Sequence, residues 1–222
     1  MTLREPRTVK ELLNRASALY GKTIGEVAIS LNLSVPIDQT KNKGFVGEMI
    51  ELCLGASAKN LPLPDFKKLG IELKTIPIGE NQSPTESTHV CSAVLKPSIR
   101  ELWTNSRVFK KLKKVLWVPI QSDKTVKLEN RIIGDSFLWS PSPEQEIVLR
   151  HDWEEHMELI ALGKFSELNG ERGEYLQIRP KARNSNATAS ATSESGEQGW
   201  ALPRGFYLRA SFTTQIIQSS MN

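Results

Sequence analysis

Hydrophobic and polar positions recur along this chain with two different periods. Over residues 8–20, 23–33 and 44–54 apolar side chains return every three or four positions, which is the spacing of one buried helix face. Thr8 with Glu11 marks a helix start, and Gly21 and Gly55 mark helix ends. Residues 142–162 predict the longest helix, with these side chains in its core: Ile147, Leu149, Met157, Leu159 and Ile160.

Shorter runs rich in β-branched and aromatic side chains predict strands. They cover residues 70–78, 88–95, 115–120 and 131–139, and a further two, 174–179 and 205–209, are expected to pair. A short helix is expected over 98–104, and residues 184–199, which hold no large apolar side chain, predict a mobile loop. Helices first, then strands with interleaved helices, indicate a mixed α/β fold.

Composition narrows the class of protein. The chain has 222 residues, of which 39% are hydrophobic and 24% charged, enough for one large α/β domain or two small lobes. It has no apolar run long enough to cross a membrane, and its first residues lack the apolar stretch of a signal peptide. Cys53 and Cys91 lie in apolar segments and predict buried free thiols, so we expect a cytoplasmic protein.

The net charge of +4 is modest, but the basic residues are clustered. Each cluster alone is typical of a solvated face. Four clusters beside loops and strand ends fit a cleft that grips a phosphate backbone. The clusters are Lys41 with Lys43; Arg107, Lys110, Lys111, Lys113 and Lys114; Arg179, Lys181 and Arg183; and Arg204 with Arg209.

One short pattern carries chemistry. Asp65 follows Pro64, and Glu72 and Lys74 stand on the predicted strand, where alternation places both on one face. The prolines before Asp65 allow the approach to double back beside that strand. Two carboxylates suit Mg²⁺, which binds one or two acids and fills its other positions with water and phosphate. A lysine beside them can orient water and offset negative charge.

On the motif alone, a solvated Glu72–Lys74 ion pair is the more economical interpretation. The surroundings change the balance. Glu51 stands in an otherwise apolar helix, where a carboxylate is costly unless a cation or partner is near. A position facing Asp65 and Glu72 would explain why this helix carries an acid. The alternative is an acid at the edge of the core, paired with a nearby lysine.

Three further positions stay open on the residues alone. One lysine among Lys110, Lys111, Lys113 and Lys114 could serve the site, without a means of choosing. Arg179, before Pro180 and Lys181, predicts a turn that reads a DNA groove, because arginine bonds guanine with two hydrogen bonds. For Tyr207 a core position is favoured over a base contact. The three histidines lack zinc-ligand spacing, and the chain has no glycine-rich phosphate loop.

The longer blocks resemble the MutH family, the strand-nicking endonucleases of methyl-directed DNA mismatch repair. The resemblance rests on residues 43–56, on Asp65-Phe66 with 69–77, and on 112–119, 173–181 and 202–208, in order through nearly the whole chain. This family belongs to the PD-(D/E)-x-K superfamily. The resemblance implies a restriction-endonuclease-like α/β fold, with a mixed sheet flanked by helices and two lobes around a DNA-binding cleft.

For the active site, the resemblance implies Mg²⁺ held by Asp65, Glu72 and the carbonyl of Leu73; Mn²⁺ or Ca²⁺ can occupy the same site. Lys74 would activate water. Glu51 would complete the acidic site, and Lys111 would be the additional lysine. At the DNA, Arg179 and Pro180 would sit at the recognition sequence, Tyr207 would sense adenine methylation, and Lys43 would contact DNA nearby. An aromatic residue is expected in the family where this chain has His89, so no contact is assigned there.

The resulting hypothesis is a single nuclease domain over 1–222, in which an N-terminal lobe carries 51–74 and a C-terminal lobe carries 174–209. It would nick the unmethylated strand of hemimethylated or unmethylated GATC, 5′ to the guanine. It would act as a monomer activated by MutL, and indirectly by MutS, with no membrane partner. The alternatives are a type II restriction-like enzyme that dimerises and cuts both strands, and a non-catalytic DNA-binding module.

Overall fold

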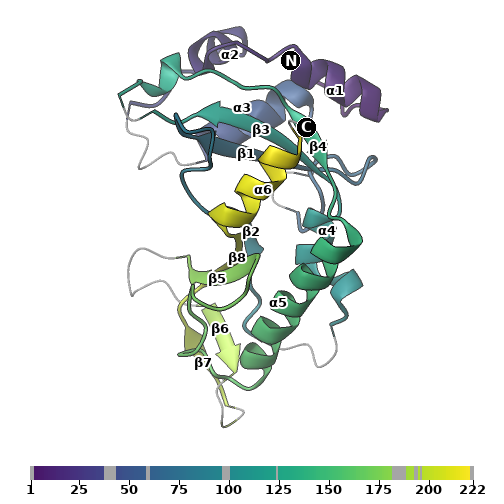
Figure 1. The fold of residues 1–222 in the computed structure, drawn as a ribbon, viewed down its shortest axis with the longest axis vertical. Coiled ribbons are helices and arrows are strands. Elements are labelled where there is room, and N and C mark those ends of the chain that lie inside the picture. Colours follow the sequence, from purple (N-terminus) through teal and green to yellow (C-terminus); the bar gives the residue numbers. More distant parts are fainter. Residues whose placement is uncertain are drawn as a thin grey trace. The chain divides into compact units, whose positions relative to one another are not determined.

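The structure is a computed structural model of the whole chain, and it describes residues 3–37, 44–58, 61–96, 101–123, 125–181, 189–192, 195 and 197–220. The chain divides into two compact units. The first contains residues 1–86, 113–140 and 217–222, and the second contains 87–112 and 141–216. Because the chain passes between the units more than once, neither unit is a continuous piece of sequence. The elements of both are labelled in Figure 1.

The first unit opens with three helices: α1 (Val9–Ser17), α2 (Ile24–Ser30) and α3 (Phe45–Leu54). The Thr8 side chain accepts a hydrogen bond from the Glu11 N–H, and Thr23 forms a reciprocal capping box with Glu26. Gly55 ends α3 in the left-handed conformation, at φ 80°. The three helices expected at this end of the chain are therefore confirmed, with Thr8 and Gly55 at the predicted ends, whereas α1 stops at Ser17, before Gly21.

A three-stranded sheet follows, with the order β1-β3-β4. The strand β1 (Glu72–Ile78) runs parallel to β3 (Val115–Gln121), and β3 pairs antiparallel with the short β4 (Phe137–Trp139). The parallel register aligns Glu72 with Val115 and Lys74 with Trp117. Since β3 is central, β1 has only one paired side within this sheet, and its other side is an edge.

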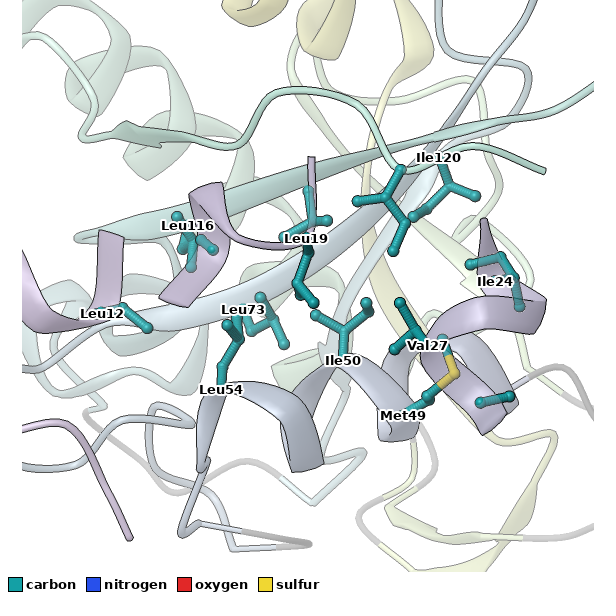
Figure 2. Close-up of a cluster of buried hydrophobic side chains, with 14 of the residues drawn as sticks. Leu12, Leu19, Ile24, Val27, Met49, Ile50, Leu54, Leu73, Leu116 and Ile120 are labelled. Atoms are coloured by element: carbon teal, nitrogen blue, oxygen red, sulfur yellow. The ribbon is translucent and has the colours of Figure 1, made fainter. Parts of the chain in front are cut away.

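A single hydrophobic cluster joins α3 to one face of this sheet. Figure 2 shows Ile50 and Leu54 of α3 beside Leu73 of β1. Leu116 and Ile120 of β3 belong to the same cluster, as do residues of α1 and α2. Because side chains alternate along a strand, burying Leu73 against α3 turns Glu72 and Lys74 to the opposite face. Packing therefore fixes which face carries the chemistry.

The second unit has its own antiparallel sheet, with the order β2-β8-β5. Its strands are β2 (Thr88–Ser92), β5 (Leu176–Pro180) and the central β8 (Arg204–Leu208), so the expected pairing of the last two is confirmed. Two helices of this unit are α4 (Arg107–Leu112) and α5 (Pro143–Ala161), and a 3-10 turn covers Trp103–Asn105. A second 3-10 turn, Leu128–Asn130, belongs to the first unit.

Three local predictions are wrong. Residues 184–199 contain strand β6 (Ala189–Thr192), which pairs antiparallel with β7 (Gln198–Ala201), so part of the expected loop belongs to a hairpin. Only the end of 131–139 is a strand, because Ile132 and Ile133 form isolated bridges instead. Ile147 is 68% exposed, and the buried face of α5 contains Trp153 and His156.

Helix α6 (Ala210–Ser220) was not expected, although Phe212, Ile216 and Ile217 give it a buried face. Three polar residues separate Phe212 from Ile216 and Ile217, so the short C-terminal segment has little apolar signal. Across the described ranges, no helix is both long and apolar enough to cross a membrane.

Candidate active site

The free edge of β1 meets the loop that precedes it. The Glu72 N–H donates to the Lys114 carbonyl at 2.9 Å, which places the backbone groups of Leu73 on the opposite side of the strand. There the Leu73 N–H donates to Asp65 Oδ2 at 2.8 Å. Since the N–H and C=O of one strand residue point the same way, the Leu73 carbonyl lies on the side of β1 that Asp65 occupies.

The loop reaches this position by a tight reversal. The backbones of Phe66 and Ile71 exchange two hydrogen bonds of 2.9 and 3.3 Å, and Gly70 takes a φ of +64° in the turn between them. Asp65, immediately before this turn, is only 6% exposed. The approach does double back beside the strand, as the prolines indicated.

Glu72 and Lys74 form a close ion pair. Lys74 Nζ lies 2.7 Å from Glu72 Oε1, and the two side chains are 15% and 2% exposed respectively. A solvated pair on an open strand face would leave both groups in water, so this burial excludes the interpretation of Glu72 and Lys74 as a solvated ion pair. Removing two charges from water is costly, which is typical of a site that uses them.

Glu51 joins the two acids electrostatically. It is half-buried on α3, and burial, followed by the charges of Asp65 and then Glu72, raises the pKa of its carboxyl to about 7. Lys74 acts in the opposite direction. The structure therefore brings Glu51, Asp65, Glu72 and Lys74 together. The exposed Glu48 of the same helix has only a small effect on the pKa of Glu51.

This arrangement fits a divalent cation by its charge and by its donors. Three carboxyl groups and one ammonium leave an excess of negative charge at the edge of β1, which a hard cation with oxygen ligands would offset. In the described ranges, no three His, Cys, Asp or Glu side chains make a metal site by themselves. The metal ligands expected here are two side chains, those of Asp65 and Glu72, together with the backbone carbonyl of Leu73.

The other predicted residues lie elsewhere in the chain. Lys111 is half-buried on α4, in the second unit, and its place beside the acids stays a prediction. Arg179 and Pro180 are exposed at the end of β5, where they pair with Gly205 and Arg204. They thus continue a strand and do not form the turn that we expected. Lys43 lies outside the described residues.

Tyr207 stands on β8 with its ring half-buried, between the buried Phe206 and Leu208. Alternation therefore turns it away from the core, against the interpretation favoured on the residues alone. His89 is its partner in the sheet, and the two rings meet edge to face at 5.1 Å and 63°. The Arg179 guanidinium lies 5.9 Å from the Tyr207 ring centroid. These three side chains form one group within the second unit.

The fourth basic cluster is structural. Arg209 donates to the carbonyls of Gly170, Glu171, Arg172 and Gly173 at 2.7–3.0 Å. Arg204 donates to the carbonyls of Leu168 and Phe165. The expectation that these two arginines grip DNA is therefore wrong, because their donors bind the protein's own loop over residues 165–173.

Sequence reasoning also missed the buried Asp152 of α5. It is 3% exposed and accepts hydrogen bonds from the N–H groups of Glu174, Tyr175 and Leu176, at 2.7–2.9 Å. These bonds fix the start of β5, and hence the strand that carries Arg179. A signal was present, since an acid beside Trp153 on the buried helix face needs partners.

A buried acid–x–lysine pair on an edge strand, with a second acid on the preceding loop, within a mixed α/β fold, defines the PD-(D/E)-x-K class of nucleases. Comparison with known proteins gives the particular family. The family described as MutH, DNA mismatch repair enzyme, matches residues 54–152.

Three relatives, each named DNA mismatch repair protein MutH, are similar over nearly their full length. The protein of Actinobacillus pleuropneumoniae serotype 3 (strain JL03) is 48% identical over 95% of this chain and 93% of its own. That of Vibrio cholerae serotype O1 (strain M66-2) is 47% identical over 96% of both chains. That of Vibrio vulnificus (strain YJ016) is 44% identical over 98% of this chain and 96% of its own. This chain belongs to the MutH family, and the expected mixed α/β fold and nuclease class are confirmed.

Proposed function

We propose that this chain nicks the unmethylated strand of hemimethylated or unmethylated GATC sites, 5′ to the guanine, during DNA mismatch repair. The reaction is hydrolysis of one phosphodiester bond. The observation that carries the proposal is the buried Glu72–Lys74 pair beside Asp65 at the free edge of β1. Membership of the MutH family supports the same reaction and the use of a divalent metal ion.

Asp65, Glu72 and the Leu73 carbonyl would hold the metal ion, and Mg²⁺ is the ion we expect there. When bound, Mg²⁺ supplies positive charge for the phosphate and makes water more acidic. Lys74 Nζ, held 2.7 Å from Glu72 Oε1, would hydrogen-bond the attacking water and orient it toward phosphorus. Glu51 would complete the acidic site, directly or through water. Lys111 would hold the phosphate as a second cation.

Recognition would belong to the second unit, on the face that carries Arg179 and Tyr207. Arg179 would bond the guanine edge in the major groove with two hydrogen bonds, and the exposed Pro180 would lie beside it. Tyr207 would meet the adenine and detect its methyl group by contact. Lys43 would contact the DNA backbone near the site. In this proposal the lobe with residues 51–74 cleaves the DNA and the lobe with residues 174–209 recognises its sequence, within a single nuclease domain.

The partners follow from the family. Duplex DNA is the substrate, MutL is the proposed activator, and MutS acts through MutL, while the protein itself works as a monomer. Its place would be the cytoplasm, where the free thiols of Cys53 and Cys91 stay reduced. Mn²⁺ or Ca²⁺ would compete for the Mg²⁺ site because they use the same oxygen ligands.

The test is Mg²⁺-dependent cleavage of a duplex with one GATC site, in unmethylated, hemimethylated and fully methylated forms, with and without MutL. We expect nicks only in unmethylated strands, with more nicking when MutL is present. Cleavage of both strands together, regardless of MutL, would favour a restriction enzyme. Absence of cleavage from every form, with DNA binding retained, would favour a non-catalytic binding module.

A further inference from the structure

The N-terminal residues are attached to the loop that carries Asp65. Glu5 accepts two hydrogen bonds through its carboxylate: Glu5 Oε2 from Ser57 Oγ, and Glu5 Oε1 from the Lys68 N–H, both at 2.9 Å. Ser57 precedes Asp65 in the chain and Lys68 follows it. One carboxylate therefore joins the two limbs of the loop.

The same limbs hold Asp65 directly. The Asp65 carbonyl accepts hydrogen bonds from the N–H groups of Ser57 and Ala58, at 3.0 and 3.3 Å. Its carboxylate accepts from the Leu73 N–H at 2.8 Å. The hydrogen bonds of Glu5 thus act on the two limbs that determine where the Asp65 side chain meets the edge of β1.

Glu5 is itself held in place. Arg15 Nη1 donates to the carbonyl of its neighbour Arg4 at 2.7 Å, and also to the Leu54 carbonyl at 2.8 Å. The N-terminal segment is therefore fixed to α1 and to the end of α3, so Glu5 offers a fixed support and not a flexible contact. The chemistry of the site uses neither Glu5 nor Ser57.

We propose that Glu5 is a positioning residue for Asp65, which keeps this acid where it can bind a divalent cation together with Glu72 and the Leu73 carbonyl. The inference rests on the proposed function of Asp65 as a metal ligand. Outer groups that orient metal ligands typically change metal affinity tenfold to a hundredfold when removed. Loss of Glu5 is expected at the lower end of that range, because the Leu73 N–H still holds Asp65.

The experiment compares Glu5→Ala and Glu5→Gln with the wild-type chain. Glutamine keeps an acceptor and can donate to Ser57, so it should restore most of the function. Ser57→Ala removes only one of the two bonds and serves if Glu5→Ala does not fold. The matched control is Glu26→Ala, which removes a carboxylate that accepts a hydrogen bond from the Thr23 N–H at 2.8 Å, in the capping box of α2.

Two measurements are made on the full chain without DNA. The first is Mn²⁺ affinity by calorimetry, which should fall about tenfold in Glu5→Ala and stay within about twofold in Glu26→Ala. The second is hydrogen exchange of the metal-free protein at the Leu73 N–H. This exchange should accelerate about tenfold in Glu5→Ala alone, because the loop that carries its acceptor Asp65 loses two of its hydrogen bonds.

The outcomes separate this inference from the proposed function. If the wild type binds Mn²⁺ and nicks DNA, but Glu5→Ala matches it in both affinity and Leu73 exchange, the positioning role is overturned alone. Equal losses in Glu26→Ala would also overturn it, by showing general destabilisation. If the wild type neither binds Mn²⁺ nor nicks DNA, the proposed function fails and this inference fails with it.

Discussion

Two charged regions of this molecule make opposite use of their charges. At the edge of β1, like charges are brought together, and the pKa of Glu51 rises to about 7 through burial and the neighbouring acids. At the ends of β8, two arginines donate to carbonyls of one loop, and Arg209 alone reaches four. The first region is costly to assemble. The second contributes to folding.

The difference shows how to interpret charged residues. Both regions looked functional in the sequence, because each combines ionisable residues with strand ends. What separates them is the nature of the partners. Carboxylates facing carboxylates require an external cation, whereas guanidinium groups facing carbonyls find most of their hydrogen-bond partners within the protein.

The largest effect is expected from Lys74→Ala. Loss of the ammonium beside Glu72 should reduce nicking about a thousandfold, because the group that orients water and offsets charge is removed. DNA binding should remain near the wild-type value, while thermal stability should fall, because Glu72 keeps a buried carboxylate without its cation. The measurements are single-turnover nicking, DNA binding in Ca²⁺ and a melting curve. Unchanged nicking would mean that the acid cluster is structural, like the arginines of β8.

Arg209→Ala should act on folding. Four carbonyls lose their donor, so the free energy of unfolding should fall by about 2–4 kcal/mol. The salt dependence of DNA binding should not change, since no phosphate contact is lost. Denaturant unfolding and a salt titration measure the two quantities. The control is Arg150→Ala, which removes an exposed ion pair with Glu154 and should cost less than about 0.5 kcal/mol. A shallower salt dependence with normal stability would return Arg209 to the DNA-binding surface.

Glu51→Gln should change how stability depends on pH in the metal-free protein. The carboxyl has a raised pKa, about 7 against 4.5, so the folded chain binds a proton between these values that the unfolded chain releases. The contribution of this proton to the free energy of unfolding is therefore complete below about pH 4.5 and is lost as the pH rises through 7. The variant lacks this loss and should gain about 1 kcal/mol over the wild type at pH 8, a value reduced for partial exposure.

Urea unfolding at pH 5 and pH 8 tests this prediction. The matched control is Glu48→Gln, an exposed acid one turn earlier on α3. A pH profile of Glu51→Gln that overlies the wild-type profile would place Glu51 outside the acidic site. Added Mg²⁺ should stabilise the wild type more than the variant, because the ion replaces the proton as the compensating charge.

The smallest effect is expected from Gly205→Ala. A Cβ there would lie 3.1 Å from Tyr207 Cε2 and 3.3 Å from His89 Cδ2, so both rings must shift by a few tenths of an ångström. We expect the preference for unmethylated over methylated strands to fall a few-fold, with cleavage itself retained. Nicking of matched duplexes measures the ratio. The control is Gly199→Ala, where an added Cβ meets nothing within 4 Å. An equal change in the control would show that the His89–Tyr207 ring pair has no specific role in sensing methylation.

Local rules predicted the elements that carry the chemistry. Thr8 and Gly55 act as the helix start and the helix end that the sequence predicts, and alternation placed Glu72 and Lys74 on one face of β1. These signals depend only on neighbours in the chain. Burial of the Glu72–Lys74 pair could not be predicted in this way, because it depends on strands and helices far away in the sequence.

The misses have the same physical origin. The hairpin of β6 and β7 has one large apolar side chain, Trp200, among small and polar residues, so no periodic apolar face distinguishes it from a loop. Ile147 fits the helical pattern, yet the packing of α5 selects Trp153 and His156 for its buried face. The destinations of Arg204 and Arg209 depend on a loop more than thirty residues earlier, as their hydrogen bonds show.

The parallel pairing of β1 with β3 has a consequence for synthesis. The N–H of Glu72 needs the carbonyl of Lys114, which the ribosome adds long after the acids themselves. Parallel strands far apart in sequence pair only after the intervening chain has closed, which is slow. We therefore expect a nascent chain that ends before Val115 to contain Asp65, Glu72 and Lys74 but no nuclease site. An enzyme that cuts chromosomal DNA would thus remain harmless until its central strand has been made.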